Sequence, residues 1–266
     1  MIKLIASDLD GTLLDDEKRL PADFFEVLDR IFEKGVRFAV SSGRTYNAVE
    51  HLFPAEYCKK MDFICDNGAC ILRGGEPLDI TPLDRGTFTE LLDACAKIGR
   101  LKVLVCAAGG TYHLADSDEF NAEVRKFYKN HIVCDSLYDV KDTIYKLAVC
   151  DMQGTMQRAK PAVDAIFGSR LNVQVSGPVW MDVMASGVNK GAALRRLTEL
   201  VGAQYENVMA FGDYFNDVEM LKAAGWSFCM ENGHEDVKKL CRYVAPSNNE
   251  GGVTRMIRRY VLGDRV

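Results

Sequence analysis

The sequence lacks long apolar runs. No uninterrupted apolar stretch approaches the roughly 20 residues with which a helix crosses a bilayer, so we expect no membrane span and no membrane partner. The apolar run near the start is short and is broken by Asp8 and Asp10, which does not fit a secretory signal peptide. These absences favour a cytoplasmic protein.

Closely paired cysteines and clustered basic residues are also missing. The nine cysteines are scattered without a CxxC pair, and their odd number favours reduced thiols over a disulfide framework. The four histidines do not have the spacing of metal ligands. The net charge is -5 and no basic block occurs, so the composition gives no reason to expect nucleic acid as a partner.

What the sequence does contain is a regular alternation of short apolar strands and amphipathic helices. In the first 70 residues we expect strands at 2–7, 36–41 and 62–65, with helices at 21–34 and 45–53. Short continuous apolar strands separated by helices favour a parallel sheet that is covered on both faces. The fold class predicted for the chain is therefore α/β, with a Rossmann-like core.

The middle of the chain has a different pattern, with more hairpins. Residues 70–80 predict a hairpin that turns at Gly74-Gly75, and Thr81-Pro82 is a plausible boundary. The strand–helix alternation returns after Gly187. We therefore predict a core domain in two parts, 1–81 and 185–266, with residues 82–184 inserted as a smaller α/β cap domain.

Two aspartates stand where the first candidate strand ends. Asp8 and Asp10 follow the apolar run Leu4 to Ala6 and precede Gly11-Thr12, and alternate residues of a strand share one side. Two carboxylates so close repel each other unless a cation or a shared proton compensates. This arrangement suits a magnesium ion with a nucleophile and a proton donor. The structural alternative is a strand that ends in a polar turn.

Two further segments contain residues that could bind a phosphate group. Ser42 and Gly43 follow the second strand, where a hydroxyl and backbone N–H groups can bind phosphoryl oxygens; Ser42 could instead be an ordinary helix cap. Lys190 begins a candidate helix, a position that opposes the helix dipole unless an anion lies there. An exposed surface lysine is the structural alternative.

The strand predicted at 208–211 also ends in acidic residues. Val208 to Phe211 run into Gly212-Asp213, and Asn216 and Asp217 follow within one helical turn. Oxygen-bearing side chains of this kind are ligands that magnesium prefers. The alternative is a helix capped by Asp213, with solvated polar neighbours.

The motifs around Asp8, Ser42, Lys190 and Asp213 occur along the chain in the same order as those of the haloacid dehalogenase superfamily, which they resemble. The resemblance covers the whole chain. Within the superfamily the chain looks like the Cof-type sugar-phosphatase branch, which has a large α/β cap. The supporting segments are Asp8 to Leu14, Ser42-Gly43-Arg44, Asp66-Asn67-Gly68-Ala69, Gly187-Val188-Asn189-Lys190-Gly191, Gly212 to Asp217, and Asn249-Glu250-Gly251-Gly252-Val253. Gly251 stands where Asp is frequent in this branch, which leaves the resemblance intact.

The resemblance implies a hydrolase that removes phosphate from small phosphorylated metabolites, sugar phosphates by default. It implies that Asp8 is the nucleophile and Asp10 the general acid and base. Mg²⁺ would be bound by Asp8, the backbone carbonyl of Asp10, and Asp213, with Asn216 and Asp217 orienting these ligands. Ser42, Gly43 and Lys190 would bind the transferring phosphoryl group.

Two other functions remain open on the sequence alone. A phosphomutase of the phosphomannomutase type would share Asp8 and Asp10 but would need a second cationic phosphate site in the cap. A non-catalytic protein that binds a phosphorylated metabolite would keep the fold, because one fold supports several functions. The sequence does not indicate the individual ester or the oligomeric state.

Overall fold

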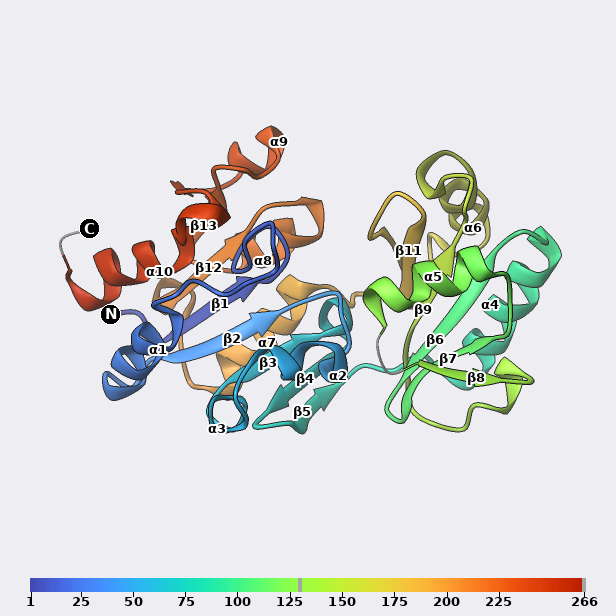
Figure 1. Ribbon diagram of the computed structural model, residues 1–266, viewed down its shortest axis with the longest axis horizontal. Helices are drawn as coiled ribbons and strands as arrows, with labels where there is room; N and C mark the ends of the chain where they lie inside the picture. The colour runs from blue at the N-terminus through green and yellow to red at the C-terminus, as the bar shows by residue number, and fades with distance from the viewer. Residues whose placement is uncertain (129–130, 265–266) are drawn as a thin grey trace. The chain divides into compact units, whose positions relative to one another are not determined.

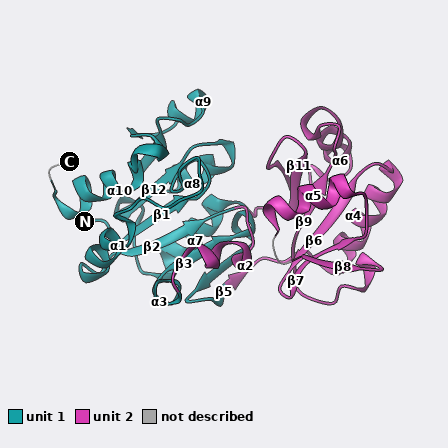
Figure 2. Cartoon of the chain, viewed as in Figure 1, with its two compact units in different colours: residues 1–42, 55–78, 189–266 teal, residues 43–54, 79–188 magenta. Residues whose placement is uncertain are grey.

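The computed structural model describes residues 1–128 and 131–264 (Figure 1). Residues 129 and 130 of the expected cap and 265 and 266 of the expected core lie outside this range. The chain forms two compact units (Figure 2): unit 1 comprises residues 1–42, 55–78 and 189–266, and unit 2 comprises 43–54 and 79–188. Within the described part of the chain, no helix is long and apolar enough to cross a membrane.

Unit 1 is built on an eight-stranded sheet, whose strand order is β14-β13-β12-β1-β2-β3-β4-β5. Neighbouring strands from β14 to β3 run parallel, and β4 returns antiparallel to β3. The strands are β1 (Leu4–Asp8), β2 (Arg37–Ser41), β3 (Asp62–Cys65), β4 (Cys70–Arg73), β5 (Glu76–Ile80), β12 (Val208–Gly212), β13 (Trp226–Met230) and β14 (Tyr243–Ala245). The predicted hairpin at 70–80 is thus confirmed as β4 and β5.

Helices cover both faces of this sheet. On one face, Leu4, Ala6 and Ala39 share an apolar cluster with Leu194 of α7 and Met220 of α8. On the other face, the ring of Phe24 in α1 packs edge-on against Phe38 of β2, at 5.4 Å between centroids. The helices of unit 1 are α1 (Phe24–Glu33), α3 (Ala55–Cys58), α7 (Lys190–Leu200), α8 (Val218–Lys222), α9 (Glu235–Lys238) and α10 (Gly252–Ile257).

Unit 2 has a six-stranded sheet in the order β10-β11-β9-β6-β7-β8. Its neighbours are antiparallel except for the parallel pair β7 and β8. The strands are β6 (Lys102–Ala107), β7 (Gly110–Leu114), β8 (His131–Cys134), β9 (Ile144–Cys150), β10 (Leu171–Val175) and β11 (Trp180–Ala185). The helices are α2 (Tyr46–Val49), α4 (Arg85–Ile98), α5 (Asp118–Phe127) and α6 (Lys160–Phe167).

The two faces of this second sheet have separate cores. Leu147 and Val149 of β9 pack with Phe88 of α4 and Phe167 of α6. Ala148, the residue between them, packs with Phe120 of α5 on the opposite face. This alternation is the period-two pattern of a strand that is buried on both sides.

The predicted α/β class is confirmed, as is a sheet with helices on both faces, which is parallel from β14 to β3. Two short elements, α3 and β8, were not predicted. In β8, Ile132 and Val133 are 40% and 54% exposed, so its apolar residues do not follow the inward and outward alternation that identifies a half-buried strand.

The packing of α7 predicts that substitutions of two of its leucines destabilise the protein to different extents. Leu197 is completely buried, whereas Leu200 is 38% exposed. We expect Leu197→Ala to lower the free energy of unfolding by about 2–5 kcal/mol, because it leaves a cavity in the core. Leu200→Ala should cost less than about 1 kcal/mol. Urea denaturation measures both, and equal losses would contradict the packing of α7 against the sheet.

Candidate active site

Three candidate residues lie at one edge of the unit 1 sheet. Asp8 is the last residue of β1, which lies between β2 and β12. Asp8 is in register with Ser41, so Ser42 directly follows the neighbouring strand end. Asp213 directly follows β12 on the other side. The carboxyl ends of parallel strands meet at one edge, where ligands of open α/β sheets bind.

Lys190 is buried beside this edge. It is the first residue of α7, and its side chain has no exposed surface. The Nζ atom lies 2.5 Å from Asp8 Oδ1 and 2.6 Å from Asp217 Oδ1. Burial alone would lower the pKa of Lys190, but the charges of Asp217 and Asp8 outweigh it and raise the pKa. Lys190 is therefore a buried cation between two carboxylates, not an exposed surface lysine.

The turn after β12 is held by Asp217. Its carboxylate is fully buried, and Oδ2 accepts hydrogen bonds from the backbone N–H groups of Asp213, at 3.0 Å, and Tyr214, at 3.3 Å. A Cβ atom on Gly212 would lie 2.5 Å from the Cβ of Asp217, so this close approach requires glycine. The hydroxyl of Thr12 donates to Asp213 Oδ1 at 3.2 Å; the sequence analysis did not single out Thr12.

Asp8, Asp213 and Asp217 form an acidic cluster, in which each offers a carboxylate oxygen within 4.8 Å of the others. Burial and the charge of Asp217 raise the pKa of Asp8 well above its ordinary value, against the opposing effect of Lys190. The same two causes raise the pKa of Asp213 to about 7. Both shifts express the cost of burying several negative charges together.

This donor set fits a divalent metal ion. Three carboxylates face one ammonium in the cluster, so the fully ionised cluster carries a formal excess of two negative charges. Mg²⁺ binds carboxylate oxygens and would neutralise that excess. The residues therefore fit the cofactor that the sequence predicts.

Asp10 and Asn216 are placed differently. The carboxylate of Asp10 is 38% exposed and forms an ion pair with Lys18 at 2.8 Å. Asp10 is not a member of the acidic cluster, although its charge contributes to the raised pKa of Asp213. Asn216 is partly buried in the turn that holds Asp217, and its side chain has no hydrogen bond to another described residue. The pairing of Asp10 with Lys18 was not among the predictions from the sequence.

Ser42 and Lys190 are connected by the turn Asp66-Asn67-Gly68. The N–H of Asn67 donates to the carbonyl of Ser42 at 3.0 Å, and Ser42 is buried. All three turn residues have positive φ, at 51°, 54° and 103°, a conformation that Asp and Asn adopt more readily than other residues with a side chain. A Cβ atom on Gly68 would lie 2.4 Å from the carbonyl oxygen of Asn189, the residue that caps the helix of Lys190.

This turn supports the site, and no role was predicted for it from the sequence. The Asp-Asn-Gly string indicates such a turn, because these residue types tolerate the left-handed backbone conformation. The contact of this turn with Asn189 depends on tertiary packing and could not be predicted from that string.

Gly43, the last predicted phosphate-binding residue, belongs to unit 2.

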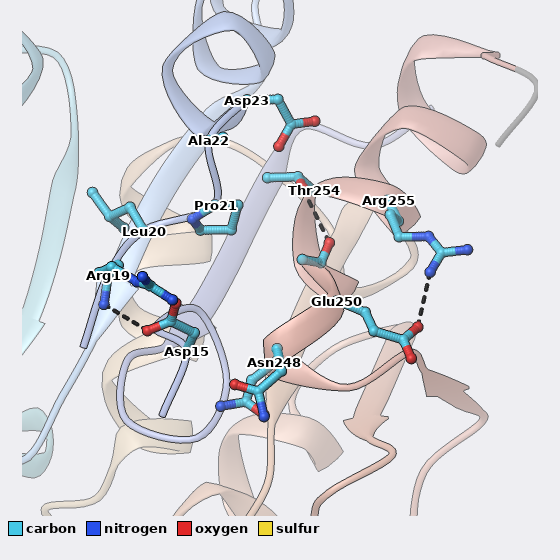
Figure 3. Close-up of a pocket in the computed structure, with 12 residues that line it drawn as sticks. Asp15, Arg19, Leu20, Pro21, Ala22, Asp23, Asn248, Glu250, Thr254 and Arg255 are labelled. Carbon is cyan, nitrogen blue, oxygen red and sulfur yellow. Dashed lines mark hydrogen bonds and ion pairs between the residues drawn. The ribbon is translucent and has the colours of Figure 1, made fainter. Parts of the chain in front are cut away.

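Unit 1 also contains a separate cavity of about 570 Å³ (Figure 3). Its lining comes from two segments, between Asp15 and Asp23 and between Asn248 and Arg255. None of the predicted site residues lines it. Four of its charged side chains form two ion pairs, Arg19 with Asp15 at 2.8 Å and Arg255 with Glu250 at 3.0 Å. The fifth, Asp23, pairs with Arg258, which is not part of the lining. The cavity therefore does not coincide with the acidic cluster.

Comparison with known proteins identifies the family. The family of haloacid dehalogenase-like hydrolases matches residues 5–257. The chain is 29% identical to the 5-amino-6-(5-phospho-D-ribitylamino)uracil phosphatase YbjI of Escherichia coli, over 96% of this chain and 95% of the relative. It is also 29% identical to YcsE of Bacillus subtilis, which bears the same phosphatase name, over 98% of this chain and 96% of the relative.

A solved structure has a similar fold over nearly the whole chain. SMU.1108c from Streptococcus mutans has a TM-score of 0.90 and 26% sequence identity, with 98% of this chain and 100% of that chain covered. The resemblance drawn from the sequence motifs is thus confirmed over nearly the full length. The chain is an enzyme and belongs to the haloacid dehalogenase-like hydrolases.

Proposed function

We propose that the protein is a magnesium-dependent phosphatase that hydrolyses small phosphate monoesters through an aspartyl-phosphate on Asp8. The main support is the buried ammonium of Lys190 between Asp8 and Asp217. A cation at this position can orient the nucleophile and receive the charge of a phosphoryl group, and these are the main requirements of phosphoryl transfer.

The reaction has two steps. First, a carboxylate oxygen of Asp8 attacks phosphorus, and the bond from phosphorus to the ester oxygen breaks. The carboxyl group of Asp10 donates its proton to the departing oxygen, which leaves as an alcohol. Second, water attacks phosphorus and gives a proton to the carboxylate of Asp10. The bond between Asp8 and phosphorus then breaks, which releases inorganic phosphate and restores both aspartates.

The remaining residues bind and orient the phosphoryl group. Ser42, through its hydroxyl, and Gly43, through its N–H, would donate hydrogen bonds to phosphoryl oxygens, while Lys190 supplies a positive charge. Asp8, Asp213 and the backbone carbonyl of Asp10 would bind Mg²⁺. When bound, this ion neutralises negative charge on the phosphoryl oxygens.

The names of the relatives support the substrate class. YbjI and YcsE are named for a substrate with a phosphorylated ribityl chain, that is, a phosphate monoester of a sugar alcohol. This agrees with sugar phosphates and related polyol phosphates as substrates of this chain.

All nine cysteines lie among the described residues and are free thiols, which supports action in the reducing cytoplasm.

Among the described residues, four arginines between positions 82 and 184 bind other protein groups, which argues against the second phosphate site that a phosphomutase needs. Two arginines of unit 2 are bound elsewhere: Arg85 donates to the carbonyls of Val140 and Tyr138, and Arg170 pairs with Glu90. Two more share one carboxylate, since Arg100 and Arg158 lie 3.1 Å and 3.8 Å from Asp151. The non-catalytic alternative is disfavoured because each predicted catalytic residue is present.

Substitution of the two aspartates tests the chemical roles. We expect Asp8→Asn to abolish phosphate release from a panel of phosphorylated metabolites, because an amide is a poor nucleophile. Asp10→Asn should slow the reaction by about 10²- to 10⁴-fold, the usual contribution of general acid–base catalysis. Phosphate release with Mg²⁺ or with excess chelator measures both effects.

Glu17→Gln is the matched control, because Glu17 lies in the same loop and its side chain is 68% exposed. It should keep the wild-type rate. Circular dichroism should show that all three variants are folded. Substantial hydrolysis by Asp8→Asn, with contaminating phosphatase excluded, would disprove the nucleophilic role of Asp8.

The raised pKa of Asp213 predicts that magnesium binding depends on pH. Without metal, the folded protein holds a proton on Asp213 up to about pH 7, whereas an unfolded chain loses it near pH 4. This group therefore stabilises the metal-free fold at low pH, and that contribution disappears as the pH rises through 7. Mg²⁺ needs the ionised carboxylate, so it should raise the melting temperature more at pH 8 than at pH 6.

Differential scanning fluorimetry at a fixed Mg²⁺ concentration makes this measurement. Asp213→Asn is the control, since it removes both the titrating group and a proposed ligand, and it should lose most of the Mg²⁺ effect at either pH. An equal or larger increase in melting temperature at pH 6 for the wild type would contradict the prediction.

A further inference from the structure

Unit 2 contains a buried ion pair that the proposed reaction does not use. The side chains of Lys146 in β9 and Asp182 in β11 are only 2% and 3% exposed, and Lys146 Nζ lies 3.0 Å from Asp182 Oδ2. Lys146 is in register with Met184, two positions from Asp182. Both side chains therefore extend from the same face of the sheet, as diagonal neighbours.

Apolar residues follow Lys146 on the same face of β9. Ala148 and Cys150, which alternate with Lys146 along β9, pack with Phe120 of α5 and with Trp180 of β11. Removing two charges from water beside such residues costs free energy, and apolar side chains of similar shape often stabilise a fold equally well. Stability alone therefore does not account for a lysine and an aspartate at these positions.

A second contact of Lys146 suggests what the pair does. Its Nζ atom donates a hydrogen bond to the carbonyl oxygen of Gly43 at 2.7 Å. Gly43 is the first residue of the 43–54 segment of unit 2, and it is covalently bonded to Ser42, where a segment of unit 1 ends. Glycine has the widest backbone freedom of any residue. A buried ammonium on the Gly43 carbonyl fixes the peptide group between Gly43 and Arg44, and this limits the rotation open to the N–H of Gly43 in the preceding peptide group.

We propose that Lys146 and Asp182 form a positioning pair for phosphate binding. Asp182 holds the ammonium of Lys146, and Lys146 holds the carbonyl of Gly43. The N–H of Gly43 and the adjoining hydroxyl of Ser42 are thereby kept in one orientation toward the phosphoryl oxygens. This inference rests on the proposed function, which assigns phosphate binding to Ser42 and Gly43.

The test replaces the pair and measures binding of inorganic phosphate in the presence of Mg²⁺ by isothermal titration calorimetry. Lys146→Met leaves the carboxylate of Asp182 buried without this ammonium, which can unfold the protein. The double variant Lys146→Met/Asp182→Leu removes both charges with side chains of similar shape, so it should keep the fold. We expect it to bind phosphate about tenfold more weakly, as for the loss of one charge-assisted hydrogen bond.

Two further measurements separate positioning from a structural role. Binding of Mg²⁺ alone should be unchanged in the double variant, because the acidic cluster of unit 1 does not include Gly43. Arg100→Met is the matched control in unit 2. It removes a partner at 3.1 Å from Asp151, whose side chain is 2% exposed, without touching Gly43, and it should bind phosphate as the wild type does.

The possible outcomes are distinct. Wild-type phosphate affinity in the folded double variant would overturn the positioning role, whatever happens to the melting temperature, and would leave the proposed function intact. Weakened phosphate binding with unchanged Mg²⁺ binding would support it. A wild-type protein that neither binds phosphate nor hydrolyses any ester would overturn the proposed function, and this inference with it.

Discussion

The buried ammonium of Lys190 between Asp8 and Asp217 is the interaction on which the rest of the site depends. A lysine without exposed surface is tolerated only when carboxylates compensate its charge, and here two do so at 2.5 Å and 2.6 Å. The contact joins three parts of unit 1 that are distant in sequence: the end of β1, the start of α7 and the turn after β12. Gly212 and Gly68 serve this arrangement, because each permits a close approach that a side chain would block.

The same contact leaves a charge imbalance that directs the chemistry. One ammonium does not neutralise three neighbouring carboxylates, and burial therefore raises the pKa values of Asp8 and Asp213. In the proposed mechanism, a divalent cation held by Asp8 and Asp213 would restore this balance and would keep Asp8 ionised for nucleophilic attack. Asp10 differs because it is partly exposed and paired with Lys18. Contact with water would let its carboxyl group exchange protons between the two steps of the proposed reaction.

Much of this could be predicted from local sequence, and the exceptions have physical reasons. Asp8, Ser42 and Asp213 follow short apolar strands, and parallel strands bring their carboxyl ends together. The burial of Lys190 could not be predicted, since it depends on Asp217, which lies 27 positions further along the chain. The pairing of Asp10 with Lys18 involves a positive φ of 63° at Lys18, a conformation that lysine rarely adopts. The exposed strand β8 lacked the alternation by which strands are identified.

The most direct test of the account is to look for the covalent intermediate. The enzyme would be mixed with a ³²P-labelled phosphate monoester and Mg²⁺, quenched with acid within milliseconds, and digested for mass spectrometry. We predict phosphate on the peptide that contains Asp8, formed at a rate at least equal to turnover and absent from Asp8→Asn. Turnover without a phosphorylated peptide, or with the phosphate on a different residue, would contradict the central role of Asp8.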